Sequence, residues 1–138
     1  MSWNKMIPKE EIQVKVTANT VLFAEEFGKF LAEKNETAKE EPLTTTQLRR
    51  FFGEVKRQQM TDFNETEFVM LKPKLAYAVG RAKQSGRKGT HQKIEDFYNV
   101  LADAIDKVIS SPNKPLARKN FITVFEAIVA YHKAAEKK

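Results

Sequence analysis

The sequence contains no cysteine, and this absence removes several kinds of chemistry at once. Disulfides, thiolate nucleophiles, zinc fingers and iron–sulfur clusters all use cysteine side chains. Glycine and proline are also scarce, with five of each in 138 residues, which disfavours a turn-rich β fold. No apolar run reaches the roughly 18 residues of a transmembrane helix, and residues 1–8 lack the apolar core of a signal peptide. We therefore expect a cytoplasmic protein with no membrane partner.

Side chains suited to catalysis or to cofactor binding are equally sparse. The two histidines, His91 and His132, fall in different predicted helices, and neither has a carboxylate at metal-ligand spacing. His132 lies on an apolar helical face, which is more typical of a core histidine than of a ligand. The phosphate-binding motifs GxxxxGK[ST] and GxGxxG are both missing. No serine has nearby sequence partners that would activate it as a nucleophile, so a catalytic triad is possible only if the fold assembles it from distant residues. We predict no cofactor and no enzymatic activity.

What the chain does contain is a set of amphipathic helical patterns. Residues 12–16 alternate as a strand would, but the helical period continues after them, so we predict a helix there. Four of the predicted helices span about 9–34, 64–84, 91–110 and 114–135. Another, the second along the chain, begins at Thr44. The sequence therefore predicts an all-α fold, a single-domain bundle of about five amphipathic helices over residues 1–138. The polar segment 35–42 is expected to be a linker, and the glycine-flanked basic segment 84–90 a loop.

Two local signals locate helix boundaries. Thr44 and Gln47 fit a capping box, and Leu43 and Leu48 occupy the positions of a hydrophobic staple. Pro73 should kink or split the third helix, because proline has no amide donor and clashes with the preceding turn. The residues expected to be buried are Ile12, Val16, Phe23, Phe27, Phe30, Leu31, Leu48, Phe51, Phe52, Val55, Phe68, Leu71, Leu75, Ala78, Ala82, Ile94, Phe97, Tyr98, Leu101, Ile105, Val108, Phe121, Val124, Phe125, Ile128 and His132.

The net charge of +6 is unevenly distributed along the chain. Residues 1–43 carry 6 basic and 8 acidic side chains, whereas residues 44–138 carry 18 basic and 10 acidic ones. Residues 68–94 hold seven basic side chains and no acidic one, and residues 107–125 hold four and none. One such run is usually a solvated face, but two runs beside a basic helix favour a polyanionic partner.

The second helix places its cations away from its apolar stripe. At about 100° per residue, Arg49 and Lys56 lie on one side of the polar face, and Arg50 and Arg57 lie on the other. Gly53 falls between the two pairs, where it would let a phosphate–sugar backbone approach the helix. The alternative is that Gly53 makes room for another helix.

The third helix repeats this arrangement around an aromatic ring. Tyr77 lies opposite the apolar stripe, within a basic face that includes Lys74 and Arg81. Cations that neutralise phosphates, beside a ring on which an unstacked base can lie, are typical of single-stranded RNA binding. The alternative is a tyrosine packed on a neighbouring helix. Arg87 and Lys88 in the following loop would add phosphate contacts.

Three segments resemble a known family. They are LTTTQLRRFF at 43–52, LKPKLAYA at 71–78 followed by Gly80 and Arg81, and FEAIVAYH at 125–132. In this order and spacing they are similar to the small subunit of type III-A CRISPR effector complexes, subunit two of the Csm complex. The resemblance covers about residues 43–135.

The resemblance implies a non-catalytic, all-helical subunit that serves antiviral defence in a ribonucleoprotein. Several copies would stack into a minor filament that lines the path of the CRISPR RNA and target RNA beside other Csm complex subunits. The placement of the 35–42 linker and of the Gly86–Gly89 loop, apart from the resemblance, leads us to expect that the free chain dimerises or exchanges a helix. The predicted RNA-binding residues are Arg49, Arg50, Lys56, Arg57, Lys74, Tyr77, Arg81, Arg87 and Lys88. The alternative function is a helical protein–protein adaptor whose basic face meets an acidic protein partner.

Overall fold

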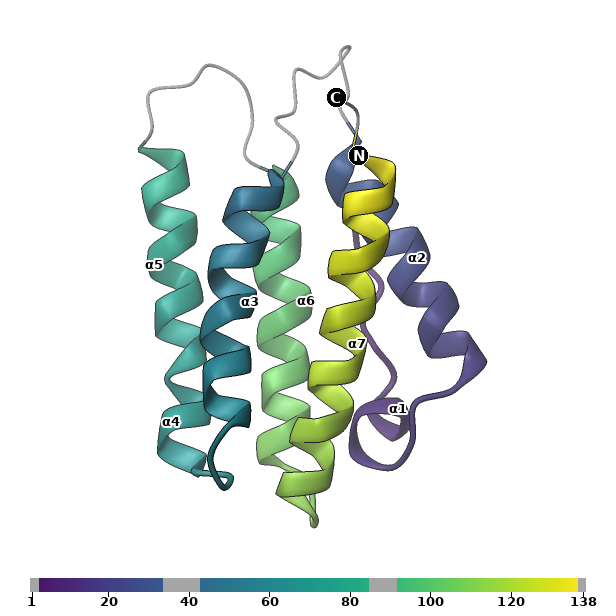
Figure 1. Cartoon of the computed structure of the whole chain (residues 1–138), viewed down its shortest axis with the longest axis vertical. Coiled ribbons are helices and arrows are strands. Elements are labelled where there is room, and N and C mark those ends of the chain that lie inside the picture. The colour runs from purple at the N-terminus through teal and green to yellow at the C-terminus, as the bar shows by residue number, and fades with distance from the viewer. Residues whose placement is uncertain (1–2, 34–42, 85–91, 137–138) are drawn as a thin grey trace.

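The computed structural model describes residues 3–33, 43–84 and 92–136, which form seven α-helices and no β-strand. Four helices run side by side, with α3 and α6 antiparallel to α5 and α7, and α2 packs obliquely across α7 (Figure 1). The helices are α1 (Lys9–Gln13), α2 (Ala18–Ala32), α3 (Thr45–Gln59), α4 (Glu65–Val69), α5 (Leu71–Lys83), α6 (Gln92–Ile109) and α7 (Lys114–Ala135). The all-α prediction is confirmed. The linker at 35–42 and residues 85–90 of the predicted loop, including Arg87 and Lys88, lie outside the described residues.

The first predicted helix, 9–34, is wrong as a single element, because residues 14–17 separate α1 from α2. Thr17 is the N-cap of α2, and its amide donates to Thr20 Oγ1 at 2.9 Å. Three of the four separating residues are β-branched and restrict their side-chain torsions in a helix, so a capped restart is favoured. The buried stripe is confirmed for Ile12, Phe27 and Leu31, which are fully buried, whereas Val16, Phe23 and Phe30 are only half-buried against the core.

The predicted start of α3 is confirmed in detail. The Gln47 amide donates to Thr44 Oγ1 at 3.1 Å, and the Thr44 amide donates to Gln47 Oε1 at 2.9 Å. These reciprocal bonds form the capping box, and the flanking Leu43 and Leu48 are both buried. The entry of the chain into α3 is therefore fixed by local sequence.

The third predicted helix is split, as Pro73 required. α4 ends at Val69 and α5 begins at Leu71, so Pro73 becomes the third residue of α5. In the first turn a backbone amide has no acceptor within the helix, so the missing N–H of proline leaves no hydrogen bond unmade. Ala78 and Ala82 are less buried than predicted: Ala78 is exposed and Ala82 is half-buried. The reason is that α5 packs mainly against α6 and stands at the edge of the bundle.

The core joins phenylalanines from several helices. Phe125 on α7 lies with its ring centroid 5.8 Å from that of Phe51, 5.9 Å from Phe97 and 6.1 Å from Phe121. His132 is also fully buried, and its Nε2 lies 2.5 Å from the carbonyl oxygen of Leu43. Its prediction as a core histidine is confirmed. Among the described helices, none is both long and apolar enough to cross a membrane.

Candidate nucleic-acid interface

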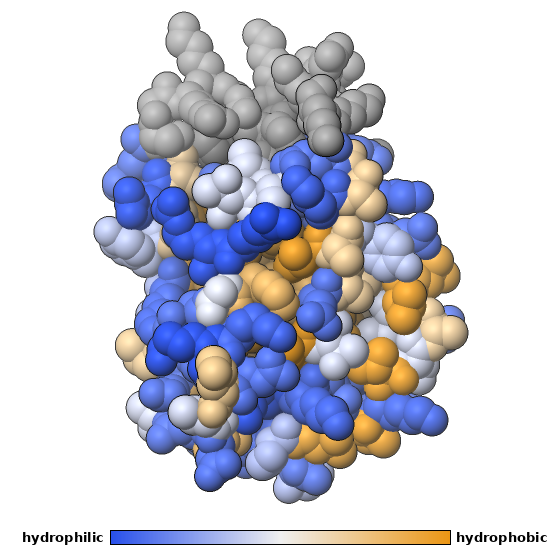
Figure 2. All heavy atoms as spheres, in the orientation of Figure 1, coloured by the Kyte–Doolittle hydropathy of each residue, from blue (hydrophilic) through white to orange (hydrophobic). Residues whose placement is uncertain are grey.

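A groove of about 460 Å³ lies between α3 and α5, above residues of α6. Figure 2 shows the face that carries these helices, where apolar residues are visible between hydrophilic side chains. The lining residues are Leu43, Gln47, Arg50, Phe51, Glu54, Lys74, Leu75, Tyr77, Ala78, Arg81, Ala82, Ile94 and Phe97. The groove thus has an apolar floor and a predominantly cationic rim.

The rim brings together predicted site residues from two helices. Arg50 comes from α3, and Lys74, Tyr77 and Arg81 come from successive turns of α5. Tyr77 is 68 % exposed, so the alternative in which its ring packs on a neighbouring helix is wrong for the described part of the chain. The guanidinium carbon of Arg81 lies 5.9 Å from the Tyr77 ring centroid. A cation and an aromatic face therefore stand side by side at the groove mouth.

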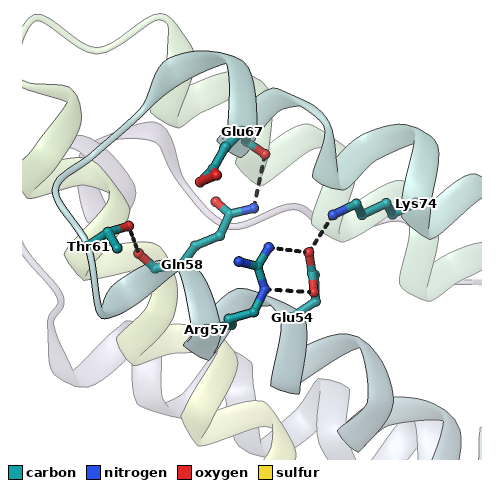
Figure 3. A network of polar contacts seen from close by, with 6 residues as sticks. All are labelled: Glu54, Arg57, Gln58, Thr61, Glu67 and Lys74. Atoms are coloured by element: carbon teal, nitrogen blue, oxygen red, sulfur yellow. Dashed lines mark hydrogen bonds and ion pairs between the residues drawn. The ribbon is translucent and has the colours of Figure 1, made fainter.

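One acidic residue, Glu54, ties the two walls of the groove together (Figure 3). Its Oε1 accepts a hydrogen bond from Arg57 Nη2 at 2.8 Å, and its Oε2 accepts one from Arg57 Nε at 3.3 Å. Lys74 reaches across from α5 and donates to the same Oε1. The hydrogen bonds from Arg57, then from Lys74, lower the pKa of Glu54 from 4.5 to about 2. The carboxylate is therefore ionised throughout the physiological range.

A second set of polar contacts lies at the C-terminal end of α3, close to the Glu54 cluster in Figure 3. Gln58 is buried, and its Nε2 donates to the backbone oxygen of Glu67 in α4 at 3.0 Å. Thr61 Oγ1 donates to the backbone oxygen of Gln58 at 3.2 Å. Arg118 from α7 donates to that same oxygen and to the Thr61 carbonyl, each at 3.1 Å. These bonds supply donors to the Gln58 carbonyl in the last turn of α3 and to the Thr61 carbonyl beyond it, and they tie this end of α3 to α4 and α7.

The cations predicted on α3 do not share one surface. Arg50 lines the groove, and Arg57 donates a hydrogen bond to Glu54, which also lines it. Arg49 and Lys56 do not line the groove. Lys56 Nζ lies 4.0 Å from a carboxylate oxygen of Glu126 on α7. The predicted basic face is therefore divided into a groove side and an α7 side.

Much of the charge in the two acid-free runs is neutralised by acidic residues from elsewhere in the chain. The ion pairs are Lys72–Asp106, Lys74–Glu54, Lys83–Glu95, Lys107–Asp103 and Lys114–Glu65. Lys93 is buried, donates to the Phe30 carbonyl at 2.7 Å and stands 3.6 Å from the Phe30 ring centroid. Within the described ranges, Arg49, Arg50 and Arg81 are the predicted site cations without an acidic partner.

Gly53 lies on the open surface of α3. A Cβ added there would meet nothing within 4 Å, and the residue is exposed. In the part of the chain that the structure describes, no helix packs on this position. The alternative role for Gly53, making room for another helix, is therefore wrong for these residues.

The comparison with protein families agrees with the sequence motifs. Residues 15–138 match the family described as Csm2 Type III-A. The chain belongs to the Csm2 family. Membership of this family implies a subunit of a type III-A CRISPR–Cas complex, which includes other subunits. The matched range begins before α2, so it takes in more than the Csm2 motifs recognised from residue 43 onwards. Neither the curated proteins nor the solved structures include a match.

Sequence reasoning missed two parts of this candidate site. The first is Glu54, whose position three residues before Arg57 was a usable signal for an ion pair on α3. The second is the apolar floor, to which Phe51 and Phe97 contribute although both were assigned only to the core. No pattern in the sequence indicated that α5 would stand apart from α3. In chemical terms the site can bind anions and stack a planar ring, and no three His, Asp or Glu side chains among the described residues are grouped as metal ligands.

Proposed function

We propose that the chain is a non-catalytic, RNA-contacting scaffold subunit of its type III-A CRISPR–Cas ribonucleoprotein. In this role the groove between α3 and α5 lies along the path of the CRISPR RNA and the target RNA. The subunit braces the complex for antiviral defence, and catalysis belongs to other subunits.

The observation that carries this proposal is that three cations and an exposed aromatic ring line one groove. Arg50, Lys74, Arg81 and Tyr77 come from two helices separated by α4, and Arg81 stands beside the Tyr77 ring. Arg50 and Arg81 have no acidic partner among residues 3–33, 43–84 and 92–136, so both guanidinium groups are available to phosphates. Tyr77 offers a face on which a base can stack.

The expected mode of recognition is independent of RNA sequence. Arginine and lysine side chains supply donors for phosphate oxygens, and pairing between the guide and the target already supplies specificity in RNA-guided systems. Binding that rests on phosphate contacts weakens steeply as salt rises, because each neutralised phosphate releases counterions. The RNA affinity of the complex should therefore depend on this groove and fall with ionic strength.

Contacts with neighbouring subunits and with further copies of the chain complete the proposal. Val14, Val21 and Leu22 of the α1–α2 region are 63 %, 43 % and 52 % exposed. Figure 2 shows apolar side chains along that side of the molecule. Exposed apolar groups of this kind are typical of protein–protein contacts, and they lie away from the groove lining. This separation allows the chain to hold RNA and protein neighbours at once.

The test is charge reversal in the assembled complex. Arg50→Glu and Arg81→Glu should each lower RNA retention at moderate salt by about tenfold. Lys119→Glu is the matched control, since Lys119 is exposed, has no acidic partner among the described residues and does not line the groove. Circular dichroism should show unchanged helicity in all three chains. Equal retention by the groove variants and the control would contradict the proposal and favour an acidic protein partner for this face.

A further inference from the structure

The groove contains a negative charge at the centre of its cationic wall. Among the described residues that line it, Glu54 is the acidic one, and its side chain is 26 % exposed. Its carboxylate is held from its own helix by Arg57 and from the opposite helix by Lys74. A groove suited to polyanions thus holds an anion of its own.

The nitrogen donors around this carboxylate are arranged as they would be around a phosphate. Arg57 presents two nitrogen donors to the two oxygens of Glu54, at 2.8 Å and 3.3 Å, and Lys74 adds an ammonium donor to one of them. Guanidinium groups bind carboxylate and phosphate oxygens with the same forked arrangement. The two cations are therefore already oriented toward a single anionic point inside the groove.

We propose that Glu54 occupies the position of an RNA phosphate in the groove, and that Arg57 and Lys74 exchange this carboxylate for a phosphate when RNA binds. This inference rests on the proposed function, because it takes the ligand of the groove to be RNA. Glu54 is then a residue that limits affinity: it keeps two cations in place but competes with every phosphate that enters. Since its carboxylate is ionised at neutral pH, the competition is always present.

The exchange predicts that removal of the Glu54 charge tightens RNA binding. Glu54→Gln keeps the size of the side chain and removes the charge that holds both cations, so the affinity of the full-length chain for a fluorescently labelled single-stranded RNA should rise about tenfold at low salt. Asp106→Asn is the matched control, because Asp106 binds Lys72 at 2.8 Å outside the groove lining. It removes the same charge and should raise affinity about twofold at most. Fluorescence anisotropy measures both.

A double-mutant cycle separates this role from a purely structural tie between α3 and α5. Lys74→Gln should weaken RNA binding severalfold more in the Glu54→Gln chain than in the unmodified chain, because Lys74 is then free for phosphate. If Glu54 only joins the two helices, Lys74→Gln has the same small effect in both.

The outcomes distinguish the two proposals. The proposed exchange would be overturned if the Glu54→Gln chain bound RNA no better than the Asp106→Asn chain. It would also be overturned if the Glu54→Gln chain bound RNA more weakly than the unmodified chain, or not measurably. If Arg50→Glu and Arg81→Glu still weaken RNA retention in the complex, the proposed function stands without it. If those two variants retain RNA normally, the proposed function and the proposed exchange both fail.

Discussion

The three described glycines of the helices give the sharpest test of the packing. Gly28 of α2 lies against α7, and a Cβ added there would stand 2.8 Å from the His132 backbone nitrogen, 2.9 Å from Tyr131 Cβ and 3.0 Å from the Ile128 carbonyl oxygen. At Gly53 and Gly80 a Cβ would meet nothing within 4 Å. The same Gly→Ala change should therefore have opposite effects at the two kinds of position.

The magnitudes follow from two competing terms. Replacing a helical glycine by alanine favours the helix by about 1 kcal/mol. At Gly28 the close atoms belong to the α7 backbone and a Cβ, which cannot rotate away, and overpacking costs about 1–3 kcal/mol, more for a contact with fixed atoms. We expect Gly28→Ala to lower the free energy of unfolding by about 1–2 kcal/mol, because α2 must move off α7. Gly53→Ala and Gly80→Ala should each raise it by about 0.5–1 kcal/mol.

Urea and thermal unfolding followed by circular dichroism measure these differences. For a chain of this length, 1 kcal/mol shifts Tm by about 3–5 °C, so the variants should separate clearly. Gly28→Val should be less stable than Gly28→Ala, since the larger side chain adds to the same collision. A Gly28→Ala chain that is as stable as the Gly53→Ala chain would refute the close approach of α2 to α7.

Three further predictions concern polar contacts. Thr44→Ala removes the N-cap of α3 and should lower the free energy of unfolding by about 1 kcal/mol in urea titrations; no change would contradict the cap. Arg118→Met removes the hydrogen bonds to the Gln58 carbonyl of α3 and to the Thr61 carbonyl beyond it, and should destabilise the chain by about 1–3 kcal/mol, unlike Lys119→Met. Glu54 has a folded pKa of about 2 against 4.5, so its stabilisation is present above about pH 4.5 and is lost as pH falls toward 2. NMR titration should show this depressed value, and Glu54→Gln should remove that part of the acid dependence; a Glu54 pKa near 4.5 would contradict the network.

Local signals predicted helix boundaries well where a few neighbouring residues determine the outcome. The capping box at Thr44 and the break enforced by Pro73 act within a few residues, and both are confirmed. The separation of α1 from α2 was not predicted, because the helical period that follows residues 12–16 was taken to outweigh their strand-like alternation, although Thr17 prefers to cap a new helix. Periodicity reports which face is apolar and does not report whether the helix is continuous.

The candidate site was predicted less completely, because charge along a sequence is not charge on a surface. The run at 68–94 lacks acids, yet Lys72 pairs with Asp106 and Lys93 is buried against Phe30. Such contacts depend on how α6 packs against α5 and α2. The angles around α3 placed Arg50 correctly on its polar face, but they could not show that α5 would supply the opposite wall of a groove.

Photo-crosslinking in the assembled complex is the most direct test of whether the groove between α3 and α5 contacts RNA. The complex would carry guide and target RNA with photoreactive nucleotides, and crosslinked peptides of this chain would be identified by mass spectrometry. The account predicts crosslinks at Tyr77 and within residues 47–57 and 74–84, which border the groove. Crosslinks confined to α2 or α7, or RNA crosslinks that involve only other subunits, would contradict it.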